Sequence, residues 1–290
     1  MNVVEYKKDE KIISPCYVAN MPSDIYHAHD SISNSGLKLV NRSPAHFKFP
    51  PERVETRNKI LGSALHMACL EPDLFYKTYT LLRNAKDRVC AEYKDAKKIH
   101  GEEFVLVSSE CTKIEGIMNS LHSNFEIRNL LEQPGHNELS GFAKDPETGV
   151  ICRHRFDKLT SSAIAVDLKT TVDARKHAFS RAIFNYGYHV QNAFYNDQHK
   201  WITGADLEGF FFVAVESESP FACKMYELDL DSFEAGRDSY RKNLNIYAYC
   251  KEQNEWPAYD SALDEIRIPR WALDEHEKNI IDNMTFTEDN

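Results

Sequence analysis

The sequence contains no apolar run that approaches the ~20 residues a helix needs to cross a bilayer. Its opening stretch, Met-Asn-Val-Val-Glu-Tyr-Lys-Lys-Asp, lacks the basic and then apolar layout of a secretory signal. Internal repeats and low-complexity tracts are also absent. These absences argue against a membrane-spanning or secreted chain and predict a cytoplasmic protein with no membrane partner.

The cysteines offer no structural framework. The sequence has seven, an odd number, and no two are spaced as Cys-x-x-Cys. Zinc ribbons use such pairs, and disulfide-rich domains use an even set at regular spacing. The cysteines are therefore expected to be reduced thiols.

Basic residues are outnumbered, and the net charge of −10 by itself argues against a nucleic-acid partner. The distribution of charge changes this view. Residues 38–98 hold thirteen Lys or Arg and seven Asp or Glu, whereas residues 259–290 hold three basic and nine acidic side chains. A local basic surface attracts phosphate even on an acidic protein. Ordinary surface solvation explains the acidic end equally well.

Two neighbouring strands carry the most informative polar residues. Alternation puts Arg153, Arg155 and Asp157 on one face of a strand. Asp167 and Lys169 share a face at the end of the next apolar run, and a short turn joins the two runs as an antiparallel hairpin. Two carboxylates and an ammonium then converge, and carboxylate oxygens are the ligands that Mg²⁺ prefers. An Asp-x-Lys alone is more often a solvated strand end.

Two predicted helices carry further candidates. Residues 57–70 have apolar side chains at helical spacing, and His66 lies just off the centre of that stripe. Residues 188–203 form a second helix, on which Gln191 and Tyr195 are four apart and share a face. Each has an ordinary structural explanation: core packing or capping for the histidine, and helix-face contacts for the other two.

The order of elements predicts a mixed α/β fold. Helices come first, then three strands, two helices, two strands and a long helix. The first of the three strands carries Glu138, an acid that needs no functional explanation by itself. The three strands are expected at residues 136–143, 150–159 and 163–170. The expected parts of the chain are an N-terminal arm, one folded domain and an acidic C-terminal tail, at residues 1–29, 30–255 and 256–290.

Together these residues resemble the PD-(D/E)xK nuclease superfamily. An Asp on one strand, Asp-Leu-Lys on the next and Gln-x-x-x-Tyr on a following helix match its motif. Three stretches, at residues 62–66, 167–171 and 188–195, are similar to the RecE-like branch, the exodeoxyribonuclease VIII type. The resemblance covers about residues 30–250. It implies a restriction-endonuclease-like core, a central mixed β-sheet flanked by helices, with an N-terminal helical elaboration.

The resemblance also implies roles for these residues. The implied metal ligands are His66, Asp157, Asp167 and the backbone carbonyl of Leu168. Lys169 would position the attacking water and help to deprotonate it, and Gln191 and Tyr195 would form hydrogen bonds nearby. Glu138 would be an accessory acid close to the metal. The implied nuclease domain is the segment at residues 30–255.

The expected cofactor is Mg²⁺, and Mn²⁺ should substitute because it favours the same oxygen-rich geometry. Arg155 and Arg153 are expected to hold the DNA phosphate, and Arg155 is preferred because it is two residues from Asp157 on the same face. No base-reading motif is visible, so binding should depend on the DNA backbone and weaken with salt.

The RecE-like resemblance further implies processive 5′-to-3′ digestion of double-stranded DNA that leaves 3′ single-stranded tails. It implies a ring-shaped homo-oligomer, a tetramer in that branch, and a single-strand annealing protein as partner in phage-type recombination. Two alternatives stay open. A structure-specific or restriction-type endonuclease of the same superfamily would not need a free DNA end. A non-catalytic DNA-binding protein would keep only the fold, and the retention of the full residue set argues against it.

Overall fold

The computed structural model describes residues 3–8, 10–52 and 55–278. Residues 1–256 form one compact unit and residues 257–290 form a second. Within the second unit, residues 270–278 are helical, and Arg270 pairs with Asp274 one turn later. This helix lies in the segment that the sequence predicts to be an acidic tail.

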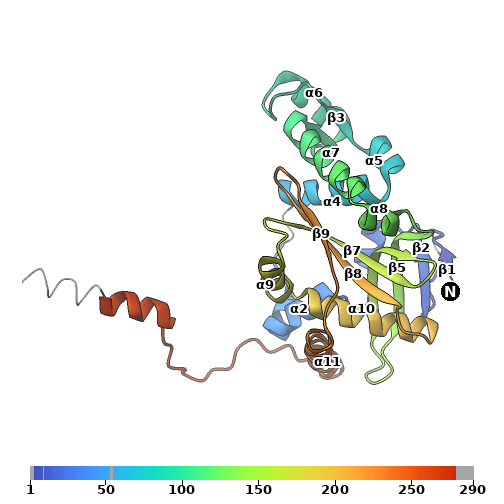
Figure 1. The fold of residues 1–290 in the computed structure, drawn as a ribbon. Coiled ribbons are helices and arrows are strands. Elements are labelled where there is room, and N and C mark those ends of the chain that lie inside the picture. Colours follow the sequence, from blue (N-terminus) through green and yellow to red (C-terminus); the bar gives the residue numbers. More distant parts are fainter. Residues whose placement is uncertain (1–2, 9, 53–54, 279–290) are drawn as a thin grey trace, which may run out of the picture. The chain divides into compact units, whose positions relative to one another are not determined.

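A mixed sheet is the centre of the larger unit (Figure 1). In the described residues its seven strands run in the order β1 (Val3–Glu5), β2 (Cys16–Ala19), β5 (Gly135–Lys144), β6 (Ile151–Thr160), β7 (Ile164–Thr171), β8 (Gly209–Glu216) and β9 (Cys223–Tyr226). The pairs β1–β2 and β7–β8 are parallel, and the other neighbours are antiparallel. A separate parallel pair consists of β3 (Thr80–Leu82) and β4 (Val105–Val107).

Helices cover both faces of this sheet (Figure 1). One face carries α4 (Arg57–Leu70), α5 (Pro72–Thr78), α7 (Ser108–Ser123) and α8 (Phe125–Glu132), with α6 (Ala91–His100) and a 3₁₀ turn (Glu102–Phe104) beyond them beside β3 and β4. The other face carries α9 (Lys176–Tyr186) and α10 (Tyr188–Thr203), backed by α2 (Asn34–Arg42), α3 (Pro44–Lys48) and α11 (Leu230–Gln253). The short α1 (Ser23–Ala28) packs near β2 and β5.

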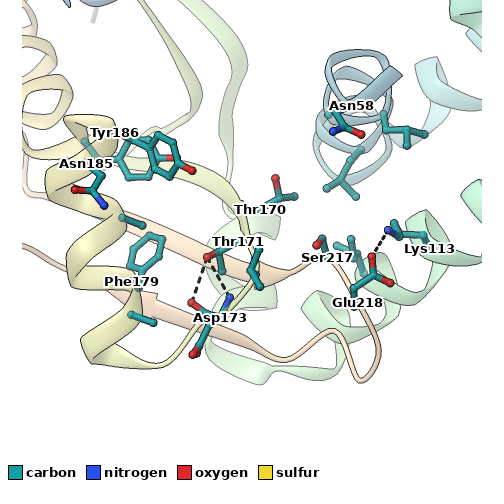
Figure 2. Close-up of a pocket in the computed structure, with 18 of the residues that line it drawn as sticks. Asn58, Lys113, Thr170, Thr171, Asp173, Phe179, Asn185, Tyr186, Ser217 and Glu218 are labelled. Atoms are coloured by element: carbon teal, nitrogen blue, oxygen red, sulfur yellow. Dashed lines mark hydrogen bonds and ion pairs between the residues drawn. The ribbon is translucent and has the colours of Figure 1, made fainter. Parts of the chain in front are cut away.

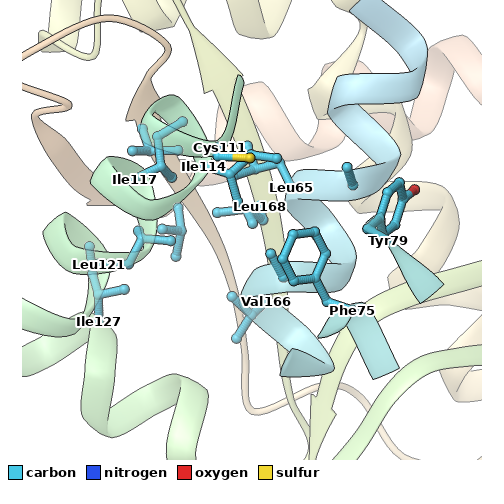
Figure 3. Close-up of a cluster of buried hydrophobic side chains, with 14 of the residues drawn as sticks. Leu65, Phe75, Tyr79, Cys111, Ile114, Ile117, Leu121, Ile127, Val166 and Leu168 are labelled. Atoms are coloured by element: carbon cyan, nitrogen blue, oxygen red, sulfur yellow. The ribbon is translucent and has the colours of Figure 1, made fainter. Parts of the chain in front are cut away.

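The apolar run of β7 explains why it lies between two helical layers. Val166 and Leu168 point to one side and pack against Leu65 of α4, Phe75 of α5 and Ile114 of α7 (Figure 3). A strand that is apolar on both faces is typical of a buried parallel pair. Full burial of each such aliphatic side chain contributes roughly 1.5–3 kcal/mol. This cluster therefore holds α4 over the strand that carries the Asp-x-Lys.

The opposite face of the same strands forms a second cluster. Ala165 of β7 and the aromatic Phe210 and Phe212 of β8 pack against Phe179 of α9. A third cluster continues outward through Phe194 of α10 to α2 and α11. Clusters on both faces leave the central strands little freedom to shift.

The predicted fold class is confirmed: a central mixed sheet is flanked by helices. The three predicted central strands and the two predicted helices at residues 57–70 and 188–203 agree with the structure within one residue at each end. The segment expected to be an arm contributes β1 and β2 to the main sheet, where Tyr17 of β2 pairs with Gly141 of β5. Two very short strands carry too little alternation to be recognised from sequence.

A buried ion pair fixes α4 against α7. Nε of Arg57 donates to Glu110 at 2.7 Å, its terminal nitrogen pairs with the second carboxylate oxygen, and the carboxylate also accepts from the Val107 amide at 3.0 Å. Burial acts to raise the pKa of Glu110, but Arg57 and that amide outweigh it, so the pKa is lowered. The pair therefore helps to set the position of α4, the helix that carries His66.

We expect Glu110→Ala to lower the free energy of unfolding by about 3 kcal/mol, because it leaves the charge of the largely buried Arg57 guanidinium without its carboxylate. Glu115 is a matched control on the same helix, since its pair with Arg83 is 2.7 Å long but exposed. Glu115→Ala should cost less than about 1 kcal/mol. Urea unfolding of both variants measures the difference, and equal losses would contradict the role given to Arg57 and Glu110.

Candidate metal centre

Two adjacent strands lose their regular alternation at the same level of the sheet. Phe156 and Leu159 of β6 belong to the same buried cluster although they are three residues apart, so the chain changes face between them. The regular pairing of β5 with β6 leaves out Glu138 of β5 and Asp157 of β6. Glu138 also has a left-handed φ of 47°. Such a φ is uncommon outside glycine and is typical of functional sites. We call this irregularity, centred on Glu138 and Asp157, the kink.

The next pair of strands separates at the same level. In the described pairing, β6 and β7 match at two positions, and Lys158 with Val166 is the one nearer the acidic residues. Beyond it the Asp157 carboxylate bridges the strands, because Oδ2 accepts the backbone N–H of Leu168 at 2.7 Å. β7 keeps its pairing with β8 along its whole length. Asp157 thus joins β6 to β7 through its side chain, beyond the last described backbone pair.

Asp167 of β7 is almost fully buried, with 2% of its surface exposed. Its Oδ1 accepts a hydrogen bond from Gln191 Nε2 of α10 at 2.6 Å, and its Oδ2 lies 2.5 Å from Lys169 Nζ. Burial raises the pKa of Asp167 against the opposing effect of Lys169. Burial disfavours the charge on Lys169, but Asp167 and Asp157 outweigh it and raise the pKa of Lys169. Lys169 therefore keeps its positive charge at neutral pH.

His66, Glu138 and Asp157 form a group that could hold a metal ion. His66 Nδ1 lies 3.6 Å from Asp157 Oδ2, and one ligand atom from each of the three residues lies within 4.8 Å of the others. An imidazole nitrogen with two carboxylates suits a divalent cation. The buried Asp167 Oδ2 lies outside this group and is already paired with the Lys169 ammonium at 2.5 Å. The residues present therefore fit a divalent cation.

The sequence-predicted ligands divide between two neighbouring groups. His66 and Asp157 lie in the three-residue group, while Asp167 is outside it and is held by Gln191 and Lys169. Glu138, expected only as an accessory acid, lies inside the group. Its position depends on the kink, which the strand pattern does not reveal.

Leu168 and Tyr195 are placed close to this centre. Leu168 gives its backbone N–H to Asp157, and a metal contact by its carbonyl stays a prediction. The Tyr195 ring lies 5.1 Å from the ring of His154 and 5.6 Å from that of Phe156, between centroids. Burial raises the pKa of Tyr195 well above its ordinary value. Tyr195 thus packs among the rings of the sheet, one turn of α10 beyond Gln191.

Arg153 and Arg155 attach the N-terminal segment to the sheet. The buried Arg153 donates to the carbonyl of His29 at 2.5 Å and also to that of Ser31. Arg155 donates to the carbonyl of Met21 at 2.8 Å. A phosphate contact by either side chain stays a prediction, and the partly exposed Arg155 has the better access to solvent.

Lys38 of α2 is a charged neighbour that the sequence pattern did not single out. Its Nζ donates to the Tyr186 carbonyl at 2.5 Å. Burial lowers the pKa of Lys38, and the ammonium of Lys169 lowers it further. Lys38 precedes Lys169 by about 130 residues, so no local sequence pattern indicates that the two side chains lie close together.

A cleft of about 740 Å³ adjoins the end of β7 (Figure 2). Its walls come from α4, α7, α9 and the residues that follow Lys169 in the chain. Figure 2 shows Tyr186 and Asn185 on one wall and Asn58 and Lys113 on the other. The polar and charged side chains that line the cleft include Asn58, Glu110, Lys113, Thr170, Thr171, Asp173, Arg181 and Glu218. Thr170 directly follows Lys169, so the cleft adjoins the carboxyl end of the strand that carries the Asp167–Lys169 pair.

Comparisons with known proteins assign the sequence to a family. The profile of a family described as "PDDEXK-like domain of unknown function (DUF3799)" matches residues 33–268. A crystal structure of a candidate exonuclease from Eubacterium rectale is similar with a TM-score of 0.59 and 14% identity, over 87% of this chain and 97% of that one. An alkaline exonuclease from Laribacter hongkongensis matches with a TM-score of 0.26 and 10% identity, over 68% and 96%. At 14% identity, the first likeness concerns the fold.

The search of curated proteins gave no match. Across the part of the chain that the structure describes, every helix is too short or too polar to cross a membrane.

Glu138 generates a pH-dependent prediction. Burial, followed by the charge of Asp157, raises its pKa from 4.5 to about 8. Between these values the folded protein holds a proton that the unfolded chain has lost, so stability without a bound cation falls as pH rises from 4.5 to 8. In EDTA, Glu138→Gln should leave Tm nearly unchanged at pH 5 and raise it by about 3 °C or more at pH 8.

Differential scanning fluorimetry at the two pH values measures this effect. The exposed Glu208 provides the control, because Glu208→Gln should change Tm equally at both. A Glu138→Gln variant whose change in Tm is the same at pH 5 and pH 8 would contradict the raised pKa.

Proposed function

The chain belongs to the PDDEXK-like domain family, and from this premise we propose that it is a divalent-metal-dependent nuclease that hydrolyses phosphodiester bonds of DNA. One observation carries the proposal: the donor group of His66, Glu138 and Asp157 adjoins the buried pair of Asp167 and Lys169. A metal-binding group beside a fixed ammonium is the combination that phosphodiester hydrolysis requires.

The proposed chemistry assigns a task to each group. A divalent cation held by His66, Glu138 and Asp157 would activate water and offset negative charge on the phosphate. Lys169, kept cationic by its carboxylate neighbours, offers its ammonium to a phosphate oxygen or to the attacking water. Gln191 fixes Asp167 through its 2.6 Å hydrogen bond. The water oxygen bonds to phosphorus, the bond to the departing oxygen breaks, and that oxygen gains a proton.

We extend the proposal to an exonuclease that digests double-stranded DNA from 5′ ends with Mg²⁺, or with Mn²⁺ in its place. The resemblance of the motifs at residues 62–66, 167–171 and 188–195 to RecE-like enzymes supports this choice. The same resemblance supports processive action, 3′ tails, a ring-shaped oligomer and an annealing protein as partner. Arg155, with Arg153 behind it, is proposed to contact the backbone, and Tyr195 is proposed to support the site from α10.

Asp167→Asn should reduce hydrolysis by at least about 100-fold, because the buried carboxylate that holds Lys169 loses its charge. The test uses linear and closed-circular duplex DNA with Mg²⁺, with a label at one 5′ end of the linear form. The wild type should degrade the linear DNA, release the 5′ label first and leave the circle intact. Asp206→Asn, which removes an exposed acid paired with Lys200, is the control and should keep full activity.

Other results would select an alternative. Cutting of the circle by the wild type, lost in Asp167→Asn, would favour an endonuclease. Absence of cleavage with both substrates, while salt-sensitive binding persists, would favour a non-catalytic DNA-binding protein and overturn the proposed activity.

Cation binding is a separate prediction. Asp157→Asn should weaken Mn²⁺ binding by at least about tenfold, because one of two carboxylates in the donor group loses its charge. Isothermal titration calorimetry without DNA measures it, and Glu252→Gln on the exposed end of α11 is the control. Equal affinities in Asp157→Asn and the wild type would remove the metal centre from this position.

A further inference from the structure

Two tyrosines lie at the junction of α9 and α10, between the cleft and the charged pair of β7. Tyr186 ends α9 and Tyr188 begins α10. Their ring centroids are 5.6 Å apart and the ring planes differ by 28°. The ammonium of Lys169 lies 4.7 Å from the centre of the Tyr188 ring. Tyr188 is therefore a direct link from the proposed catalytic lysine to Tyr186.

Tyr186 is exposed although it is held in place. Tyr186 is 61% exposed. Its side chain lines the cleft (Figure 2). Its carbonyl accepts the 2.5 Å hydrogen bond from Lys38, and Gly187 after it has a left-handed φ of 63°, which gives the tight junction between the helices. Tyr188 is supported from behind by Phe212, with 6.0 Å between centroids. A large apolar ring is thus kept at a mouth of the cleft without being buried by the fold.

The cleft is too small for a duplex. Its volume of about 740 Å³ is in the range of pockets that take a ligand of a few hundred daltons. Thr170 and Thr171 line it with hydroxyl groups and Arg181 lines it with positive charge, whereas Lys113 is paired with Glu218. The acids Glu110 and Asp173 complete its charged lining. An aromatic ring, hydroxyl groups and the Arg181 guanidinium together complement a short piece of single-stranded nucleic acid, since the ring takes a base and the guanidinium takes a phosphate.

We propose that Tyr186, backed by Tyr188, is a stacking platform for an unpaired nucleobase, and that the cleft receives a single strand at the end of the DNA. The inference rests on the proposed function and narrows its substrate to a separated strand end. Stacking on an aromatic ring accepts every base, so the platform is tolerant of sequence. The exposed Lys38, whose ammonium lies at the Tyr186 carbonyl, supplies charge for an adjoining phosphate.

The test measures binding in EDTA, so that it is independent of hydrolysis. The probe is a fluorescein-labelled oligothymidylate whose dissociation constant is obtained from fluorescence anisotropy. Tyr186→Ala should weaken binding by about tenfold, and Tyr186→Phe should bind as the wild type does, because the ring is retained. Tyr249 is a matched control: it is also 61% exposed, lies on α11 and is outside the cleft lining, so Tyr249→Ala should have no effect.

A series of abasic substitutions in the probe makes the test specific. With the wild type, loss of one particular base should weaken binding by the factor seen for Tyr186→Ala. With Tyr186→Ala, loss of that base should have no further effect, because the two changes remove the same contact. If Tyr186→Ala destabilises the protein, Tyr186→Leu repeats the cycle with a non-aromatic side chain of similar bulk.

Wild-type affinity in both non-aromatic variants, additive effects at every abasic position, or absence of oligothymidylate binding by the wild type would each overturn the proposal. Failure of the proposed nuclease function would give a different result. The effects of Tyr186→Ala and of the abasic substitution on binding in EDTA would still be non-additive, while Mg²⁺ would produce no cleavage of any DNA.

Discussion

The centre depends on one constraint: its carboxylates lie close together with little access to water, so their negative charges repel one another. Glu138, Asp157 and Asp167 meet where strands bend or part, and each is at least partly buried. Such groups are tolerated when cations or donors compensate them. Here Lys169 and Gln191 compensate Asp167, and the Leu168 amide compensates Asp157. Burial and the charge of Asp157 raise the pKa of Glu138 to about 8, and a divalent cation bound beside it would offset the repulsion among these carboxylates.

The surrounding fold fixes these groups from three directions. The Arg57–Glu110 pair and the apolar cluster under α4 hold His66 above the sheet. α10 brings Gln191 to Asp167 from the other side, and pairing with β8 keeps β7 in register. Side chains that are fixed by packing and hydrogen bonds can hold a reactive geometry without reorganising. The aromatic junction of α9 and α10 extends this rigid frame to the mouth of the cleft.

The sequence predicted what local periodicity encodes. The strands with Asp157 and Asp167 and the helices with His66 and Gln191 have clear patterns, so their elements and order were recoverable. The kink at Glu138 is a property of two strands together, and neither pattern alone contains it. Arg155 was recognised as facing the same way as Asp157, but its bond to Met21 depends on a segment more than a hundred residues away. The sequence pattern does not indicate Lys38 either, because its position near Lys169 also depends on a distant segment of the chain.

The strand order also has a consequence for synthesis of the chain. β2 pairs with β5, which lies about 120 residues later, and β6, β7 and β8 follow β5 in the sheet. On the ribosome, β2 can pair with β1 but lacks its antiparallel partner until β5 has been synthesised. Unpaired strand edges attract other chains, and non-local pairing slows folding. The helical region at residues 57–132 can form from local contacts during that interval and precede the sheet on which it later packs.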